Sequence, residues 1–83
     1  MRILLVEDDI TLQTQLKQQL ELAKFSVDIA SDGEIGLYQG AEYNYDAAVI
    51  DLGLPKIDGK TLITTLRSQN ISFPIIILTA RDG

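Results

Sequence analysis

Residues 2–9 read RILLVEDD, a run of strand-forming side chains that stops abruptly at three acids. A continuous apolar run without alternation is typical of a strand that is buried on both faces, as in a parallel sheet. Further short apolar runs occupy residues 26–30, 47–50 and 75–78. The sequence therefore predicts four strands, of which residues 2–6 are the first.

Between the first two strands the spacing of apolar residues changes. In residues 11–23 the leucines recur every four residues: Leu12, Leu16 and Leu20. This spacing predicts an amphipathic helix whose leucines face the core, while polar residues such as Gln13 cover the other faces. Either Asp9 or Thr11 is suited to cap its N-terminus.

Two more helices are predicted, over residues 34–42 and 60–67. Gly36 and Gly40 weaken the first of them by ~1 kcal/mol each relative to alanine. The resulting order, β-α-β-α-β-α-β, indicates an α/β fold with a parallel sheet, right-handed crossovers and helices on both faces. With 83 residues there is room for one small domain.

Composition excludes several functions for this segment. The chain has no cysteine and no histidine, which removes disulfides, thiolate metal sites and histidine acid–base catalysis. Its net charge of −5 disfavours direct contact with nucleic acid, because phosphate contacts need clustered Lys and Arg. No apolar run approaches the ~20 residues that span a bilayer, and no cleavable apolar segment follows Met1. We therefore expect a soluble, cytoplasmic module.

The acids fall at the ends of strands. Glu7 and Asp8 follow the first strand and Asp51 follows the third. Sites in open α/β sheets form beyond the carboxyl ends of strands, where the strand order reverses. If the first and third strands are neighbours, these carboxylates converge, and a hard cation such as Mg²⁺ would relieve their repulsion. If the fourth strand flanks the third, the hydroxyl of Thr79 would lie near Asp51. The backbone carbonyl of Gly53, two residues after Asp51, would be within reach of the same cation.

Each acid also has a purely structural interpretation, since an aspartate after a strand is commonly a turn former or a helix cap. We assign Asp9 and Asp58 to that role. Four other acids are interpreted as surface or turn residues: Asp28, Asp32, Glu42 and Asp46. Acids at the same end of two central strands, in a chain without other catalytic chemistry, nevertheless favour a site.

Four motifs occur in order: ILLVEDD at residues 3–9, Asp32-Gly33, VIDLGLPKIDG at residues 49–59 and PIIILTARD at residues 74–82. Together they resemble the receiver domain of response regulators. Their amino-acid sequences are most similar to those of the OmpR/PhoP-like subgroup, which carries a winged-helix DNA-binding output domain. The resemblance covers the whole chain. It implies a doubly wound, flavodoxin-like sheet in which residues 1–83 form the N-terminal part of a single receiver domain. The last helices, the fifth strand and any output domain would be lacking.

The resemblance also implies roles for the acids. Asp51 would accept a phosphoryl group from a phosphohistidine on a partner sensor histidine kinase. Asp8 would ligate Mg²⁺ directly, Glu7 would help through water, and Asp51 and the Gly53 carbonyl would complete the protein's share. The chain would then be a signalling phosphoacceptor rather than an ordinary enzyme, and would reach DNA only through an output domain.

At the fourth strand the resemblance makes Thr79 the switch hydroxyl and Ala80 the small residue that leaves the acceptor accessible. The family's phosphate-binding lysine lies at the end of the fifth strand, and neither Lys56 nor Lys60 matches its position. An apolar fourth strand at the sheet edge invites pairing with another chain. We therefore expect self-association through the fourth strands or through exchanged segments.

Two other functions are compatible with parts of the sequence. A chain that folds and self-associates without phosphotransfer would be an interaction module only. A phosphatase with Asp51 as its nucleophile would generally need an acid–base aspartate two residues later, where this chain has Gly53. The phosphoacceptor is therefore the favoured function.

Overall fold

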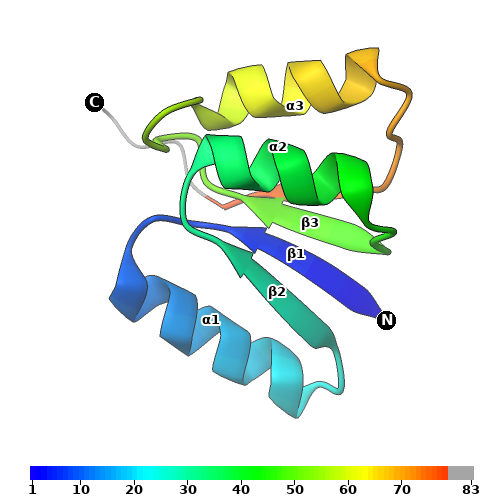
Figure 1. Cartoon of the computed structure of the whole chain (residues 1–83). Coiled ribbons are helices and arrows are strands. Elements are labelled where there is room, and N and C mark those ends of the chain that lie inside the picture. Colours follow the sequence, from blue (N-terminus) through cyan, green and yellow to red (C-terminus); the bar gives the residue numbers. More distant parts are fainter. Residues whose placement is uncertain (79–83) are drawn as a thin grey trace.

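Helices and strands alternate along residues 1–78, the part of the chain that the structure, a computed structural model, describes (Figure 1). In chain order they are β1 (Arg2–Val6), α1 (Ile10–Leu22), β2 (Ser26–Ala30), α2 (Gly33–Glu42), β3 (Ala47–Ile50), α3 (Gly59–Ser68) and β4 (Ile75–Ile77). The four strands form one parallel sheet in the order β2-β1-β3-β4. The predicted α/β fold is confirmed, and each predicted element ends within one residue of the observed one.

Each of the three helices begins after an aspartate whose carboxylate accepts a backbone N–H of the first turn. These hydrogen bonds run from Leu12 N to Asp9 (3.2 Å), from Ile35 N to Asp32 (2.8 Å) and from Thr61 N to Asp58 (2.8 Å). Such caps satisfy donors that the helix itself leaves open. The cap of α1 is therefore Asp9 and not Thr11, and the structural role assigned to Asp58 is confirmed.

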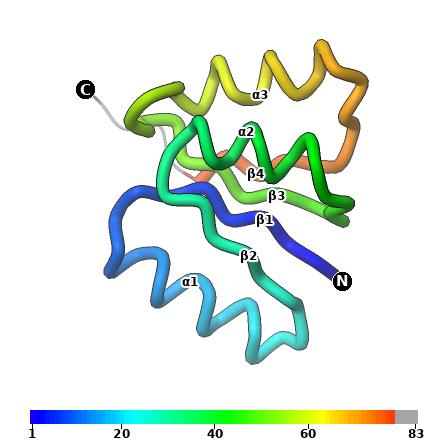
Figure 2. Tube along the Cα trace, viewed as in Figure 1, coloured from blue at the N-terminus to red at the C-terminus, as the bar shows by residue number. Residues whose placement is uncertain are grey.

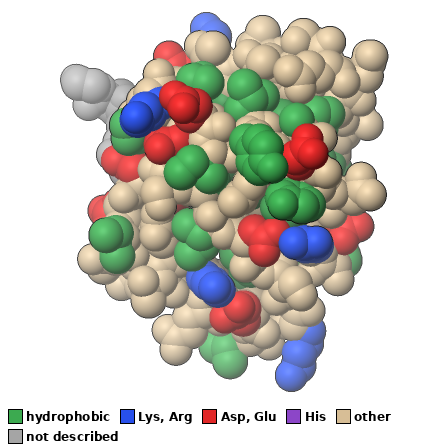
Figure 3. All heavy atoms as spheres, in the orientation of Figure 1, with side chains coloured by type: hydrophobic (Ala, Val, Ile, Leu, Met, Phe, Trp, Pro, Cys, Tyr) green, Lys and Arg blue, Asp and Glu red, His purple; other side chains and the backbone are tan. Residues whose placement is uncertain are grey.

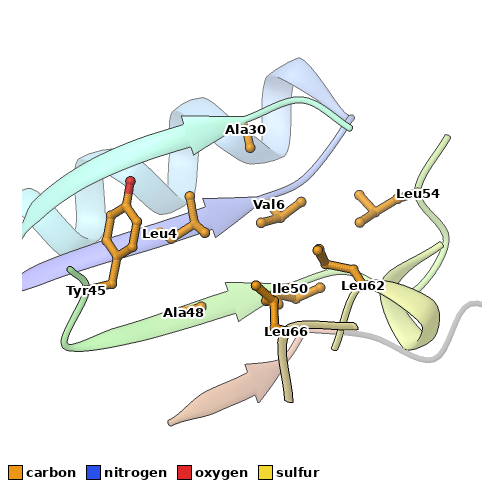
Figure 4. Packing of buried hydrophobic residues seen from close by; sticks show 9 residues of the cluster. All are labelled: Leu4, Val6, Ala30, Tyr45, Ala48, Ile50, Leu54, Leu62 and Leu66. Atoms are coloured by element: carbon orange, nitrogen blue, oxygen red, sulfur yellow. The ribbon is translucent and has the colours of Figure 1, made fainter. Parts of the chain in front are cut away.

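The two faces of the sheet are covered by different helices. On one face, α2 and α3 pack over a core to which β1, β3 and α3 contribute most: Leu4, Val6, Ala48, Ile50, Leu62 and Leu66. Figure 4 shows Leu62 and Leu66 pointing from α3 toward Ile50 of β3. On the other face, Leu16 and Leu20 of α1 pack against a smaller cluster around Leu5.

The glycines of α2 allow close packing. A Cβ atom on Gly36 would lie 3.0 Å from Cγ1 of Val6, and one on Gly40 would lie 3.0 Å from Cδ2 of Leu66. Side chains longer than that of alanine at these positions would push α2 away from β1 and α3. The same glycines that lower the helix propensity of this segment therefore permit its contact with the core.

The polar face predicted for α1 is only partly correct. Leu12, Leu16 and Leu20 are half-buried, whereas Gln13 is 7% exposed and counts among the buried residues. At the opposite extreme, Leu22 is 68% exposed. The prediction that Gln13 faces away from the core was wrong, because its side chain hydrogen-bonds to polar groups just after the carboxyl ends of β1 and β2.

A polar cluster closes the other end of the sheet, where β1 and β2 begin. The guanidinium of Arg2 lies 2.8 Å from the Asp28 carboxylate, which also accepts a 2.7 Å hydrogen bond from the hydroxyl of Tyr45. Asp46 accepts the backbone N–H of Arg2 at 2.7 Å. Asp28 and Asp46, expected to be surface or turn residues, thus tie β1 to β2 and to the start of β3.

β4 lies beside β3 at one edge of the described sheet (Figure 2). Ile76 and Ile77 are 60% and 54% exposed, respectively. Leu78, just past the strand, still donates its N–H to the carbonyl of Ile50 at 3.0 Å. This edge therefore presents both apolar side chains and unpaired ladder positions.

Candidate functional site

Three carboxylates meet at the carboxyl ends of β1 and β3. Because β1 and β3 pair with Val6 opposite Ile50, the residues that follow them emerge side by side. One carboxylate oxygen from each of Glu7, Asp8 and Asp51 lies within 4.8 Å of the others. Glu7 and Asp51 are 0% exposed and Asp8 is half-buried. The convergence predicted from the sequence is thus present.

This donor set fits a hard divalent cation. Carboxylate oxygens are the ligands that Mg²⁺ prefers, and Mg²⁺ commonly keeps several waters alongside one or two carboxylates. Buried carboxylates so close together repel one another, and a cation between them lowers that cost. Asp8 is only half-buried, so this residue of the cluster is partly accessible to solvent.

The backbone around Asp51 is folded tightly. Its N–H donates to the carbonyl of Val6 at 3.0 Å, and its Oδ1 lies 3.4 Å from the N–H of Gly53. Gly59 N donates to the carbonyl of Leu52 at 2.9 Å. A Cβ atom on Gly59 would lie 2.6 Å from Cα of Leu52 and would also overlap the carbonyl oxygen of Asp51. A glycine at position 59 therefore lets α3 start directly against the backbone of Asp51 and Leu52.

The loop between β3 and α3 is held in turn by the start of α2. Gly33 N donates to the carbonyl of Pro55 at 3.2 Å, and a Cβ atom on Gly33 would lie 2.8 Å from Cβ of Ile57. Lys56, between Pro55 and Ile57, has a left-handed backbone with φ of 72°. The motif Asp32-Gly33 is thus more than a turn: its aspartate caps α2 and its glycine receives the loop that follows Asp51.

Sequence reasoning missed Gln13 as a part of this end of the sheet. Its side-chain nitrogen donates to the backbone carbonyl of Glu7 and, at 3.2 Å, to the hydroxyl of Ser31. The helical period alone placed it among polar surface residues. Its position in the first turn of a helix that directly follows the acids was the available signal.

Of the three other predicted site residues, Gly53 alone lies within the described part of the chain. Gly53 is exposed and its N–H faces Asp51, while the role of its carbonyl as a ligand stays a prediction. Thr79 and Ala80 lie outside the described residues.

The surface and the helices add two general observations. On the face shown in Figure 3, Lys and Arg side chains lie singly among acidic and apolar ones rather than in a cluster. Among residues 1–78, no helix has both the length and the apolar character needed to cross a membrane.

Comparison with known proteins agrees with this geometry. Residues 3–83 match the family described as the response regulator receiver domain. Over all its 83 residues the chain is 51% identical to the two-component response regulator PhoP of Pseudomonas aeruginosa, and it spans 37% of that protein's length.

Two solved structures are similar in both fold and sequence. The receiver domain of the sensor histidine kinase PA1611 from Pseudomonas aeruginosa, which has a magnesium ion coordinated in its active site cleft, superposes with a TM-score of 0.92 at 34% identity, over 96% of this chain and 67% of that one. A chain from the complex of histidine kinase ThkA with the response regulator TrrA of Thermotoga maritima gives a TM-score of 0.88 at 32% identity, over 99% and 71%. By its fold, its acidic site and these matches, the chain belongs to the family of response regulator receiver domains.

Proposed function

We propose that this chain is the phosphoacceptor part of a two-component response regulator and takes a phosphoryl group on Asp51 from a sensor histidine kinase. The observation that carries the proposal is the meeting of Glu7, Asp8 and Asp51 within 4.8 Å at the carboxyl ends of β1 and β3. A receiver domain is a signalling module rather than a member of a catalytic enzyme family. The chain would thus take part in its own phosphorylation without turning over an external substrate.

The chemistry asks the protein mainly for positioning and charge neutralisation. A carboxylate oxygen of Asp51 attacks the phosphorus, a P–O bond forms, and the P–N bond to the kinase histidine breaks. The electron pair of that bond stays on the imidazole nitrogen. Bound Mg²⁺ would supply neutralisation of the charge on the phosphoryl oxygens. Asp8 would hold it directly and Glu7 through water, with Asp51 and the Gly53 carbonyl as further ligands.

Two residues of the proposed site follow β4. Thr79 would be the hydroxyl that moves to hold the phosphoryl oxygens, and Ala80 would leave Asp51 accessible. Both roles come from the family resemblance. With these roles, phosphorylation would act through the segment after β4, where movement of the hydroxyl would shift the balance between two conformations.

The proposed partners follow from the relatives. The ThkA–TrrA complex pairs a histidine kinase with a regulator, which supports a kinase as the phosphoryl donor. Because the chain spans 37% of PhoP, we propose that residues 1–83 are the N-terminal part of a receiver domain in a longer cytoplasmic regulator. Transcriptional control and DNA binding would then belong to an output domain of that parent protein.

The test is phosphorylation in vitro. The purified chain is incubated with Mg²⁺ and acetyl phosphate, and its intact mass is measured beside Asp51→Asn and Asp58→Asn. Asp58 is a suitable control because it lies in the same loop but is exposed and caps α3. We expect a phosphoryl adduct on the unsubstituted chain and on Asp58→Asn alone. An equal adduct on Asp51→Asn would overturn the assignment of the acceptor.

One observation favours a second function, that of a self-associating interaction module. β4 is an edge of the described sheet, and Ile76 and Ile77 are more than half exposed there. Two copies of such an edge can pair with each other, because each offers both N–H and C=O groups. Sedimentation of the chain and of Ile76→Lys tests this function: we expect a dimer that the lysine dissociates. A monomer at high concentration would contradict it.

A further inference from the structure

Gln13 carries the one buried side-chain amide among the described residues, and the other two buried residues of the polar and charged types there are the acids Glu7 and Asp51. It occupies a helix position where a leucine would fill the same space at no polar cost. Burying an amide is unfavourable unless its hydrogen bonds are made. The presence of glutamine here therefore indicates that its hydrogen bonds matter more than apolar packing.

Those hydrogen bonds connect three separate segments. The side-chain nitrogen of Gln13, on α1, donates to the backbone carbonyl of Glu7 at the end of β1 and to the hydroxyl of Ser31 at 3.2 Å, just after β2. A single NH₂ group has two hydrogens, so both are used. The amide thus joins the first turn of α1 to the loops that follow β1 and β2.

The contact with Glu7 bears on the acids directly. The carbonyl of Glu7 belongs to the same planar peptide unit as the N–H of Asp8, so fixing that oxygen fixes the direction in which the Asp8 backbone continues. From the other side, the N–H of Asp9 donates to the Glu7 carboxylate at 3.0 Å. The turn that carries both acids is therefore held at its main chain and at its side chain.

We propose that Gln13 is a positioning residue for the cation site: by holding the Glu7–Asp8 peptide, it sets where the Asp8 carboxylate points. This inference rests on the proposed function, because it assumes that Glu7, Asp8 and Asp51 hold Mg²⁺. Gln13 itself is not a ligand. Residues that orient metal ligands typically change metal affinity by ~10- to 100-fold when they are replaced.

The test uses Gln13→Met, which keeps the length of the side chain and removes the amide, with Gln15→Met as the matched control. Gln15 lies on the same helix and is exposed. Calorimetric titration with Mg²⁺ gives the dissociation constant, and hydrogen exchange of the Asp9 amide without metal reports on the turn itself. We expect Gln13→Met to weaken Mg²⁺ binding by about 10-fold or more and to speed exchange at Asp9. Gln15→Met should change neither.

A merely structural role would lower the thermal stability of Gln13→Met and leave both the Mg²⁺ dissociation constant and the Asp9 exchange unchanged, which would overturn the proposal. If Gln13→Met does not fold, Ser31→Ala decides, because it removes one anchor of the amide from an exposed position. A loss of Mg²⁺ affinity in Ser31→Ala, smaller than that expected for Gln13→Met, supports the proposal. An unchanged Mg²⁺ affinity overturns it. Asp8→Asn is expected to bind no Mg²⁺. If the unsubstituted chain also binds none, the proposed cation site is refuted, and the inference about Gln13 is refuted with it.

Discussion

The substitution Gly59→Ala tests how closely the start of α3 and Asp51, the proposed phosphoacceptor, depend on each other. A Cβ atom at position 59 would lie 2.6 Å from Cα of Leu52, where ordinary contacts begin at 3.4 Å, and would overlap the carbonyl oxygen of Asp51, so the backbone must separate by at least 0.8 Å (3.4 − 2.6). The atoms in the way are backbone atoms of Asp51 and Leu52, which cannot rotate aside as the end of a side chain can. Overpacking of this kind costs ~1–3 kcal/mol.

Two effects of opposite sign set the expected stability. Alanine gains at most about 1 kcal/mol over glycine within a helix, and less at the first residue of α3, so Gly59→Ala should lower the free energy of unfolding by about 1–2 kcal/mol. For a chain of this size each kcal/mol lowers Tm by ~4–8 °C. The larger effect is on phosphorylation: a misplacement of about 1 Å in a reacting group can slow its reaction ~100-fold.

The assay compares the rate of adduct formation with acetyl phosphate and Mg²⁺, together with urea unfolding, for Gly59→Ala and Gly40→Ala. At Gly40 the new Cβ would meet the flexible end of Leu66 at 3.0 Å, far from the acids. We expect Gly40→Ala to phosphorylate at the unsubstituted rate. If Gly59→Ala did so too, the loop after Asp51 would tolerate displacement and the geometric argument would be refuted.

Three further outcomes are expected. Leu66→Ala, at a fully buried site, should reduce the free energy of unfolding in urea by ~2–5 kcal/mol, while Leu22→Ala, 68% exposed, should change it by at most about 0.5 kcal/mol. A backbone N–H in the first turn of α3 holds the pKa of Asp58 below its usual range, so the stabilisation is complete above about pH 4 and is lost as pH falls through the lowered pKa. The Tm difference between the unsubstituted chain and Asp58→Asn should therefore shrink at acid pH, and a constant difference would contradict this. Burial, followed by the hydrogen bond to Asp28, raises the pKa of Tyr45 above the usual tyrosine range, so its stabilisation is complete below the ordinary tyrosine pKa and is lost as pH rises through the raised pKa. Absorbance titration should show a late-ionising phenol that disappears in Tyr45→Phe.

The main chain of this protein was predictable because its patterns are local. Apolar runs ending in acids placed β1 and β3, and the helices predicted between the strands begin within one residue of the observed ones. The meeting of Glu7, Asp8 and Asp51 needed one more step, the assumption that β1 and β3 are neighbours. The observed strand order confirms that assumption.

The contacts that sequence reasoning missed are those between residues distant in the chain. Gln13 contacts Ser31, Asp28 contacts Tyr45, and Gly33 receives the loop around Ile57. Helical period and turn propensity describe neighbours along the chain. They contain no information on which polar group of another loop will lie opposite, so buried polar contacts across loops appear only with the folded structure.

The position of β1 in the middle of the sheet has a consequence for synthesis on the ribosome. β1 is made first and is apolar on both faces, yet one of its two ladder partners, β3, ends only at Ile50. Between the completion of β2 at Ala30 and of β3 at Ile50, 20 residues (50 − 30) must be added. At about 5–20 residues per second, this leaves one edge of β1 open for roughly 1–4 s. During that interval a nascent chain carries a strand that is apolar on both faces as an unpaired edge, and pairing with a second nascent chain would compete with folding at this stage.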